Sequence, residues 1–341
     1  MKIVQIGGAG HASLAYNSIK RRGLDISALA PGNAGEQAEN TASTQSGLKR
    51  LGFDPKQYSD WREMLENETP DIVIVNPWFN NIAECSIYAL ERNINVFSEK
   101  PLASSLEELD RLEKTLANSK AGLAGMFNTR GEPSFLTAKK AVEDGLIGEI
   151  RMMDSRKSYK LGVRPAFYSS KETYCGILPW VAIHAIDWMK WLSGEKYTSV
   201  SAAHSSRANG GNGDMDITSA ALFTMTNDVI ATVTADMLRP SSARTHGDDR
   251  VRLVGTDGIL EITDGEVSLL SDRSGGRTVL QNLPPRDIFD EFLESISRKG
   301  DDPENVAKTS SQLTHDEIES TRWSLLARDS AIKGLPLSAG K

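Results

Sequence analysis

A lysine lies at the end of an apolar run in the first third of the chain. Residues 93–97 lead directly into Ser98, Glu99, Lys100 and Pro101. An ammonium group beyond the carboxyl end of a parallel strand lies where ligands of open α/β sheets bind. There it can exchange a proton with a hydroxyl group or stabilise an oxyanion. Pro101 stiffens the turn, and we predict a cis bond before it. The alternative is an ordinary turn at the point where a strand reaches the surface.

A histidine and an aspartate share one face of a strongly apolar helix expected over residues 179–192. His184 and Asp187 are three positions apart, which places both side chains on the same side of a helix. A neutral imidazole can serve as a base or hydrogen-bond a substrate, and Asp187 can orient the ring. We therefore predict catalytic roles for His184 and Asp187. The alternative for His184 is a core histidine satisfied by a neighbouring group.

A glycine-rich turn joins the first expected strand, residues 2–6, to a helix expected over residues 12–22. Glycines at this junction allow a tight turn and let a pyrophosphate approach the start of the helix. The pattern is imperfect, because small residues other than glycine occupy its third position. The alternative is a plain tight turn. The candidate cofactor-binding residues of this turn are Gly7, Gly8, Ala9, Gly10 and His11.

The end of the second expected strand, residues 25–30, lacks a residue that dinucleotide sites commonly use. An acidic residue is expected about 20 positions after the glycine turn to bind the adenosine ribose. The strand instead runs into Pro31, Gly32 and Asn33, with neither an acid nor an arginine at its tip. The choice between NAD and NADP stays open at this point, as does weak or absent cofactor binding.

The order of the expected elements indicates two domains. Strands and helices alternate up to residue 126, which predicts a doubly wound parallel sheet, the Rossmann arrangement. Beyond that point one helix over 134–144, a strand from 149 and the helix at 179–192 precede a series of strands between residues 199 and 280. Two late helices are expected over 286–298 and 314–333. We predict an α/β domain at 1–124 and an α+β domain, with a large and mainly antiparallel sheet, at 125–341.

Composition excludes several functional classes. With 341 residues, of which 39% are hydrophobic and 25% charged, the chain can bury two cores. A net charge of −7 argues against a nucleic-acid or anionic-membrane surface. We expect Cys85 and Cys175 to be free thiols, and the sequence shows no metal-binding cluster. Because the first residues lead directly into an apolar strand and no apolar stretch is long enough to span a membrane, we expect a cytoplasmic protein without a signal peptide.

The chain resembles the glucose–fructose oxidoreductase, inositol dehydrogenase and rhizopine-catabolism family, known as Gfo/Idh/MocA. The resemblance spans nearly the whole chain and depends on the order of its motifs. These are Glu99-Lys100-Pro101, the sequence GLIGEI at 145–150, residues 176–187 around His184, and the sequence GTDG at 255–258. The resemblance implies NAD(P)-dependent interconversion of a hydroxyl and a carbonyl group on a sugar, cyclitol or related polyol.

The resemblance also implies roles for single residues. The family's lysine and histidine fall on Lys100 and His184, which are expected to meet the substrate beside the nicotinamide. Asn76 and Pro77 occupy the family's cofactor segment after the third strand, and Glu99 is expected to anchor its turn or contact the nicotinamide ribose. Trp180 stands where many members have an aspartate, so the substrate of this chain is expected to differ.

A polar stretch before the histidine helix completes the candidate site. Lys160 and Arg164 could meet an anionic group on the substrate, and Tyr159 could stack on a sugar ring beside Trp180; a solvated loop is the alternative. The expected partner is a small polyol-like or sugar-like molecule, and the expected assembly is a homodimer or homotetramer through the second sheet. A non-catalytic protein that senses NAD(P) or another ligand on the same scaffold is the alternative function.

Overall fold

The computed structural model describes residues 1–36, 40–297 and 303–339, with side chains omitted at 303–313. The chain divides into two compact units, and each unit is built from segments that alternate along the sequence with segments of the other. Residues 287–321, expected in the second domain, group with the first unit. Unit 1 comprises Met1–Met126, Glu172–Cys175 and Asp287–Thr321, and unit 2 comprises Phe127–Lys171, Gly176–Arg286 and Arg322–Lys341.

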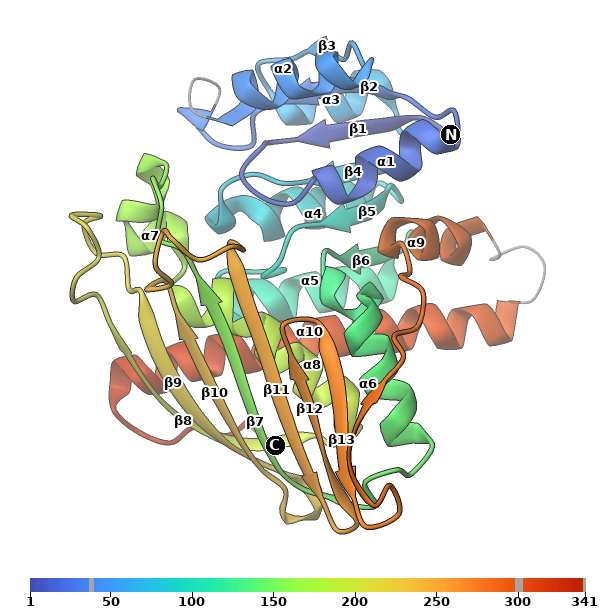
Figure 1. Cartoon of the computed structure of the whole chain (residues 1–341). Helices are drawn as coiled ribbons and strands as arrows, with labels where there is room; N and C mark the ends of the chain where they lie inside the picture. The colour runs from blue at the N-terminus through green and yellow to red at the C-terminus, as the bar shows by residue number, and fades with distance from the viewer. Residues whose placement is uncertain (37–39, 298–302, 340–341) are drawn as a thin grey trace. The chain divides into compact units, whose positions relative to one another are not determined.

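Unit 1 contains a parallel sheet whose strand order is β3-β2-β1-β4-β5-β6 (Figure 1). The chain starts at β1 in the centre, winds to one side and then returns to the other. The carboxyl ends of β1 and β4 therefore lie side by side at the point where the winding reverses, where ligands of such sheets bind. The predicted fold is confirmed. The strands are β1 (Ile3–Ile6), β2 (Ile26–Ala30), β3 (Lys56–Gln57), β4 (Ile72–Val75), β5 (Asn95–Ser98) and β6 (Leu123–Gly125).

Helices of unit 1 begin at recognisable caps. The Asp60 side chain accepts hydrogen bonds from the first turn of α3, and Ser105 accepts one from the Glu108 amide at the start of α5. The Glu108 side chain in turn accepts a hydrogen bond from the Ser104 amide at 2.9 Å. The helices are α1 (Ser13–Arg21), α2 (Ala42–Leu51), α3 (Trp61–Glu68), α4 (Ile82–Glu91), α5 (Leu106–Asn118), α9 (Ile288–Ser297) and the short α7 (Lys171–Tyr174), which begins in unit 2.

The core of unit 1 joins distant parts of the chain. β1 and β4 are completely buried, as expected for parallel strands covered on both faces. Phe97 on β5 packs edge-on against Phe289 of α9, with ring centroids 5.0 Å apart. Contacts of this kind explain why α9 belongs with the first unit despite its late position in the chain.

Unit 2 contains a mixed sheet in the order β14-β13-β12-β11-β7-β10-β9-β8. Only β7 and β10 pair in parallel; the other neighbours are antiparallel, so the prediction of a mainly antiparallel sheet is confirmed. The strands are β7 (Ile150–Tyr159), β8 (Tyr197–Ser205), β9 (Thr218–Met225), β10 (Ile230–Asp236), β11 (Gly247–Gly255), β12 (Gly258–Thr263), β13 (Glu266–Ser271) and β14 (Gly276–Leu280).

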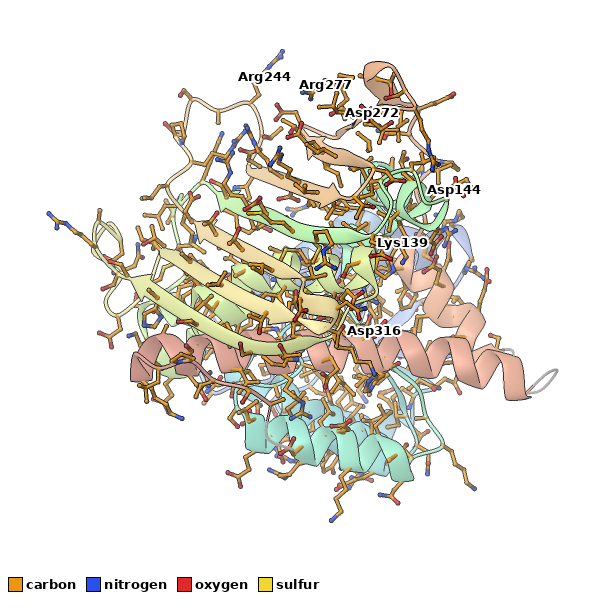
Figure 2. The ribbon with its side chains drawn as sticks, turned by 90° about the horizontal axis from the view of Figure 1, so that it is seen from below. Lys139, Asp144, Arg244, Asp272, Arg277 and Asp316 are labelled. Carbon is orange, nitrogen blue, oxygen red and sulfur yellow. The ribbon has the colours of Figure 1, made fainter. Side chains whose placement is uncertain are left out.

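Helices cover one face of this sheet. Trp188 of α8 (Ile183–Ser193) is fully buried and packs 4.7 Å from the Phe135 ring of α6 (Pro133–Glu143). The helix expected at 179–192 begins instead as a π-helical turn, Leu178–Ala182. α10 (Pro303–Lys333) starts earlier than the expected residue 314, and residue 298 of the other late helix lies outside the described residues. Figure 2 shows Lys139 and Asp144 on α6 near the sheet, with Arg277 on the edge strand β14.

The other face of the sheet carries alternating exposed side chains. Thr232 pairs with Asp154, which also pairs with Arg252 across the strands. A shallow depression of about 320 Å³ lies over this polar patch, lined among others by Arg156, Arg250 and Glu261. None of the helices among the described residues combines the length and apolar character needed to cross a membrane.

Candidate active site

The glycine turn connects the ends of three strands in unit 1. Gly7 has a φ of +76°, and a Cβ there would lie 2.4 Å from the Asn76 carbonyl oxygen. Glycine is therefore required at this position. The Gly7 amide donates to the Ala30 carbonyl at 2.7 Å, and the Ala9 amide donates to that of Asn76 at 2.8 Å. These bonds fix the turn between the tips of β2 and β4.

Glu99 holds the glycine turn and the lysine turn together. One oxygen of its fully buried carboxylate accepts the His11 amide at 2.5 Å and lies 2.8 Å from His11 Nδ1. The other accepts the Lys100 amide at 2.8 Å. A Cβ on Gly10 would meet the first oxygen at 2.0 Å, so the glycine leaves room for this carboxylate. The structure thus brings together Gly10, His11, Glu99 and Lys100.

The environment of Glu99 favours its charged form. Burial by itself would raise the pKa of the Glu99 carboxyl, but the His11 charge and hydrogen bond, together with the Lys100 charge and amide, outweigh it. The net effect lowers the pKa of Glu99 below its usual value. A carboxylate that stays charged at neutral pH is consistent with an anchor for the two turns.

Lys100 lies immediately beyond β5 and is fully buried. The Lys100–Pro101 peptide is cis, which confirms the prediction. The following turn is held by the Leu102 amide, which donates to Thr321 Oγ1 at 3.3 Å. The backbone on both sides of Lys100 is therefore fixed by hydrogen bonds from other elements of unit 1.

Asn76 and Pro77 lie at the tip of β4 beside the turn. The buried Asn76 Nδ2 donates to Met126 Sδ at 3.5 Å, whereas Asn76 Oδ1 has no hydrogen-bond partner among the described residues. That oxygen lies 3.0 Å from the position a Cβ on Gly10 would take. Pro77 packs against Gly32 of the turn after β2, where a Cβ would come within 2.2 Å of the proline ring.

Sequence reasoning missed one acidic residue at the second strand. No acid stands at the tip of β2, but the fully buried Glu36 returns to that tip from further along the chain. Its carboxylate accepts hydrogen bonds from the amides of Gly8 at 3.0 Å, Gly32 at 2.8 Å and Asn33 at 3.0 Å. A search for acids beyond the strand tip, past Gly35 with its φ of +89°, would have found it.

The residues of unit 1 fit a dinucleotide. The amides of Leu14 and Ala15 at the start of α1 donate to the carbonyls of His11 and Ala12, but those of Gly10, Ala12 and Ser13 have no acceptor among the described residues, and they lie where a pyrophosphate meets a helix start. The buried Asn76 Oδ1 offers a further acceptor at the adjacent strand tip. The turn therefore leaves donors for an anionic diphosphate, although Glu36 and Glu99 already accept the amides of Gly8 and His11.

In unit 2, Asp187 forms a buried ion pair. Its two oxygens accept from Nε and Nη2 of Arg130 at 2.8 and 2.5 Å, and both side chains are at least nine-tenths buried. Arg130 precedes α6, far from Asp187 in the sequence. His184, one turn earlier on α8, is likewise buried, at 3% exposure. The carboxylate of Asp187 thus joins two elements through Arg130.

The start of the histidine helix is capped by a distant carboxylate. Asp216 accepts the Ile177 amide at 2.8 Å, and His204 Nδ1 lies 3.6 Å from the same carboxylate. Burial raises the pKa of Asp216, but the nearby His204 imidazole and the hydrogen bond from the Ile177 amide outweigh this and lower the pKa overall. Trp180, in the π-helical turn, is buried and meets the Tyr168 ring edge-on at 6.4 Å.

The predicted substrate-binding residues lie at the end of β7 and in the loop beyond it. Tyr159 stacks on His246 with ring centroids 4.9 Å apart. Lys160 Nζ donates to the carbonyls of Ser241 and Ala243, so the loop already uses this ammonium group. Arg164 donates to the Lys160 carbonyl at 2.9 Å and lies over the Tyr168 ring.

A second buried pair beside Tyr159 was not anticipated. Lys157 Nζ donates to Asp249 Oδ2 at 2.6 Å across the β7–β11 pair. Burial opposes the charge of Lys157, but Tyr159 and Asp249 prevail and raise the pKa of the ammonium group. Burial also raises the pKa of the nearby Glu132 carboxyl. The alternating strand pattern gives no signal that a lysine faces the helices.

Metal and disulfide chemistry find no support in the described part of the chain. No group of three or more His, Cys, Asp or Glu side chains there could hold a metal ion. Cys85 and Cys175 are buried free thiols.

A Rossmann unit with this turn, followed by an α+β unit with a large sheet, defines a two-domain NAD(P)-dependent oxidoreductase class. Residues 2–124 match the oxidoreductase family with the NAD-binding Rossmann fold, and residues 135–261 match the GFO/IDH/MocA C-terminal domain. The chain belongs to the Gfo/Idh/MocA oxidoreductase family, which confirms the resemblance seen in the sequence.

Individual relatives support this assignment. A putative oxidoreductase from Thermotoga maritima is 38% identical, with a TM-score of 0.92 over 99% of this chain and 100% of its own. Inositol 2-dehydrogenase of Salmonella typhimurium (strain LT2) is 27% identical over 58% of this chain and 55% of its own. The matched region thus spans about half the length of that curated relative. A levoglucosan dehydrogenase in complex with NADH shares the fold, with 19% identity and a TM-score of 0.79 over 100% of this chain and 99% of its own.

Proposed function

We propose that this protein is an NAD(P)-dependent dehydrogenase or reductase that interconverts a hydroxyl and a carbonyl group on a sugar, cyclitol or related polyol. One observation carries the proposal: Glu99 bonds both to the dinucleotide turn and to the backbone of the buried Lys100. The names of the inositol and levoglucosan dehydrogenase relatives support the substrate class. The nicotinamide, when bound, supplies the hydride acceptor or donor.

Lys100 and His184 are proposed as the proton-transfer groups. Lys100, fixed between Glu99 and the cis-proline turn, would take the proton of the substrate hydroxyl in oxidation or stabilise the alkoxide in reduction. His184 would act as the second acid–base group or hold the substrate hydroxyl. Both side chains are buried in their own units, which supports action in a water-poor environment.

Asp187 is proposed as a positioning residue. Both of its oxygens are engaged by Arg130, so the carboxylate serves to fix α8, and with it His184, relative to the segment before α6. Tyr159, whose ring is stacked on His246, is proposed to line the sugar side of the site, with Trp180, Lys160 and Arg164 shaping the loop beside it.

Cofactor binding and turnover test the proposal separately. The expected result is quenching or enhancement of nicotinamide fluorescence on titration with NADH or NADPH, followed by cofactor reduction with at least one member of a cyclitol, aldose and anhydrosugar panel. Binding without turnover on any panel member would favour the alternative, a ligand-sensing protein. Absence of binding to both dinucleotides would contradict the proposal entirely.

We propose further that two copies associate through the exposed face of the unit 2 sheet. The face carries both signs of charge, Asp154 and Glu261 beside Arg252, and exposed apolar side chains such as Ile230 at 48% and Leu222 at 48%. Such a face is complementary to itself in a twofold arrangement. Light scattering should show a dimer or tetramer that Ile230→Glu converts to a monomer, whereas exposed Val163→Glu leaves it unchanged. A monomeric parent protein would contradict this assembly.

A further inference from the structure

The turn after β2 is occupied by the chain's own carboxylate. Glu36 Oε2 accepts the amides of both Gly32 and Asn33, the first two donors beyond Pro31 at the strand tip. Its other oxygen accepts the Gly8 amide of the glycine turn. One buried side chain therefore ties together the two turns that flank the adenosine end of a Rossmann site.

This arrangement engages the backbone donors that a phosphate would need at the tip of β2. The 2′-phosphate that distinguishes NADP from NAD is recognised in such folds by arginine or other donors at the tip of the second strand. Residues 31–36 contain no lysine or arginine, and the amides of Gly32 and Asn33 are already used. A further anion there would face the carboxylate of Glu36, and like charges repel each other.

We propose that Glu36 makes this chain select NAD over NADP, by withdrawing the two amides at the tip of β2 and by presenting a negative charge there. The residue acts through backbone amides and charge, and it requires no contact with the ribose hydroxyls. The inference rests on the proposed function, because it presumes that a dinucleotide binds at the glycine turn.

The surrounding contacts show why the carboxylate stays in place. Asn33 accepts the Trp78 amide at 3.1 Å through its side chain and donates to Asn80 at 3.1 Å, which fixes the turn from the β4 side. A Cβ on Gly35 would lie 3.5 Å from the Trp78 ring, so the indole packs over the chain just before Glu36. The turn cannot open toward a phosphate without breaking these bonds.

Equilibrium binding of NADH and NADPH to the full-length protein tests the proposal. The parent protein should bind NADH at least about tenfold more tightly than NADPH, the ratio expected from roughly one unfavourable charge contact. Glu36→Gln, which keeps an acceptor oxygen but removes the charge, should reduce this ratio toward unity. Asp54→Asn removes one exposed charge from the same unit and should leave the ratio unchanged.

A second variant covers the case in which Glu36→Gln disturbs folding. Ala34 is exposed in the turn, and Ala34→Arg adds a cation without touching the bonds of Glu36; it should tighten NADPH about tenfold more than NADH. Equal or tighter NADPH binding by the parent protein would overturn the inference while leaving the proposed function intact. An unchanged ratio in folded Glu36→Gln would also overturn it. Failure of the parent to bind either dinucleotide would instead remove the proposed function and, with it, this inference.

Discussion

The two candidate regions of the molecule position their chemistry in different ways. In unit 1, Glu99 and Glu36 act on backbone amides, and the residues they hold stand at the tips of parallel strands. In unit 2, the helix that carries His184 is held by side chains from distant segments, Arg130 on Asp187 and Asp216 at the helix start. The first region is built by the fold itself, whereas the second depends on pairs of long side chains.

This contrast predicts different sensitivities to mutation. A site held by strand tips and backbone bonds tolerates the loss of one side chain, because the sheet still orders the turns. A site held by a buried ion pair does not, because removing one partner leaves an uncompensated charge in the interior. The following experiments are directed at that difference.

The largest effect is expected at the buried pair of unit 2. Arg130→Leu should lower the free energy of unfolding by about 3–5 kcal/mol, because it leaves the charge of the buried Asp187 carboxylate uncompensated. The double variant Arg130→Leu/Asp187→Leu should regain much of the loss, because no charge remains buried. Urea unfolding followed by tryptophan fluorescence measures both.

An exposed pair supplies the control. Arg62 and Glu84 lie 3.1 Å apart with both side chains more than 40% exposed. Arg62→Leu should therefore cost less than about 1 kcal/mol. Equal losses for the two arginines would contradict the distinction between the regions.

The fold was largely predictable because its signals are local. The continuous apolar runs at β1 and β4, the Ser105 cap and the late glycine at 194 each depend on a few neighbouring residues. α2 and the two-residue β3 were missed, because residues 42–47 are rich in serine, threonine and glycine, which are weak helix formers. The π-helical start of the histidine helix likewise has no signature in its apolar sequence.

The candidate site was predictable only in unit 1. Strand tips and glycine turns can be located in a sequence, so the grouping of Gly10, His11, Glu99 and Lys100 could be anticipated. Arg130 and Asp187 meet across 57 positions, and Lys157 meets Asp249 across 92. The hydrophobic periodicity of the sequence does not predict such pairs, because their contact depends on how helices and strands pack. Glu36 was missed because it lies in the loop after β2, and its side chain turns back toward the tip of that strand.

An intermediate effect is expected at Glu99, with a definite dependence on pH. Because the folded-state pKa of Glu99 lies below the ordinary 4.5, its contribution is present above that value and is lost as pH falls through the lower folded pKa. Glu99→Gln should lower the free energy of unfolding at pH 7 by about 1–3 kcal/mol, since buried charged bonds are lost.

The pH profile separates this effect from general acid unfolding. The difference between the parent protein and Glu99→Gln, measured by urea unfolding, should shrink as pH falls below about 4.5. A difference that grows on acidification would mean that the carboxyl is protonated in the folded protein and would contradict its role as a charged anchor.

The smallest effect is expected at the cap of α5. Ser105→Ala removes the acceptor for the Glu108 amide and should cost about 1 kcal/mol of unfolding free energy. Ser43→Ala, at an exposed position in α2, should stay within about 0.5 kcal/mol. If Ser105→Ala lowered the free energy of unfolding as much as Arg130→Leu, unit 1 would not be less sensitive than unit 2 to the loss of one side chain.

The central claim is that Lys100 performs proton transfer at a site whose dinucleotide turn is fixed independently by Glu99. Its most direct test is turnover of Lys100→Met on the substrate found in the panel, together with NADH affinity. We predict a loss of turnover of about 10²- to 10⁴-fold, with a much smaller change in the NADH dissociation constant. Turnover close to that of the parent protein would contradict the account.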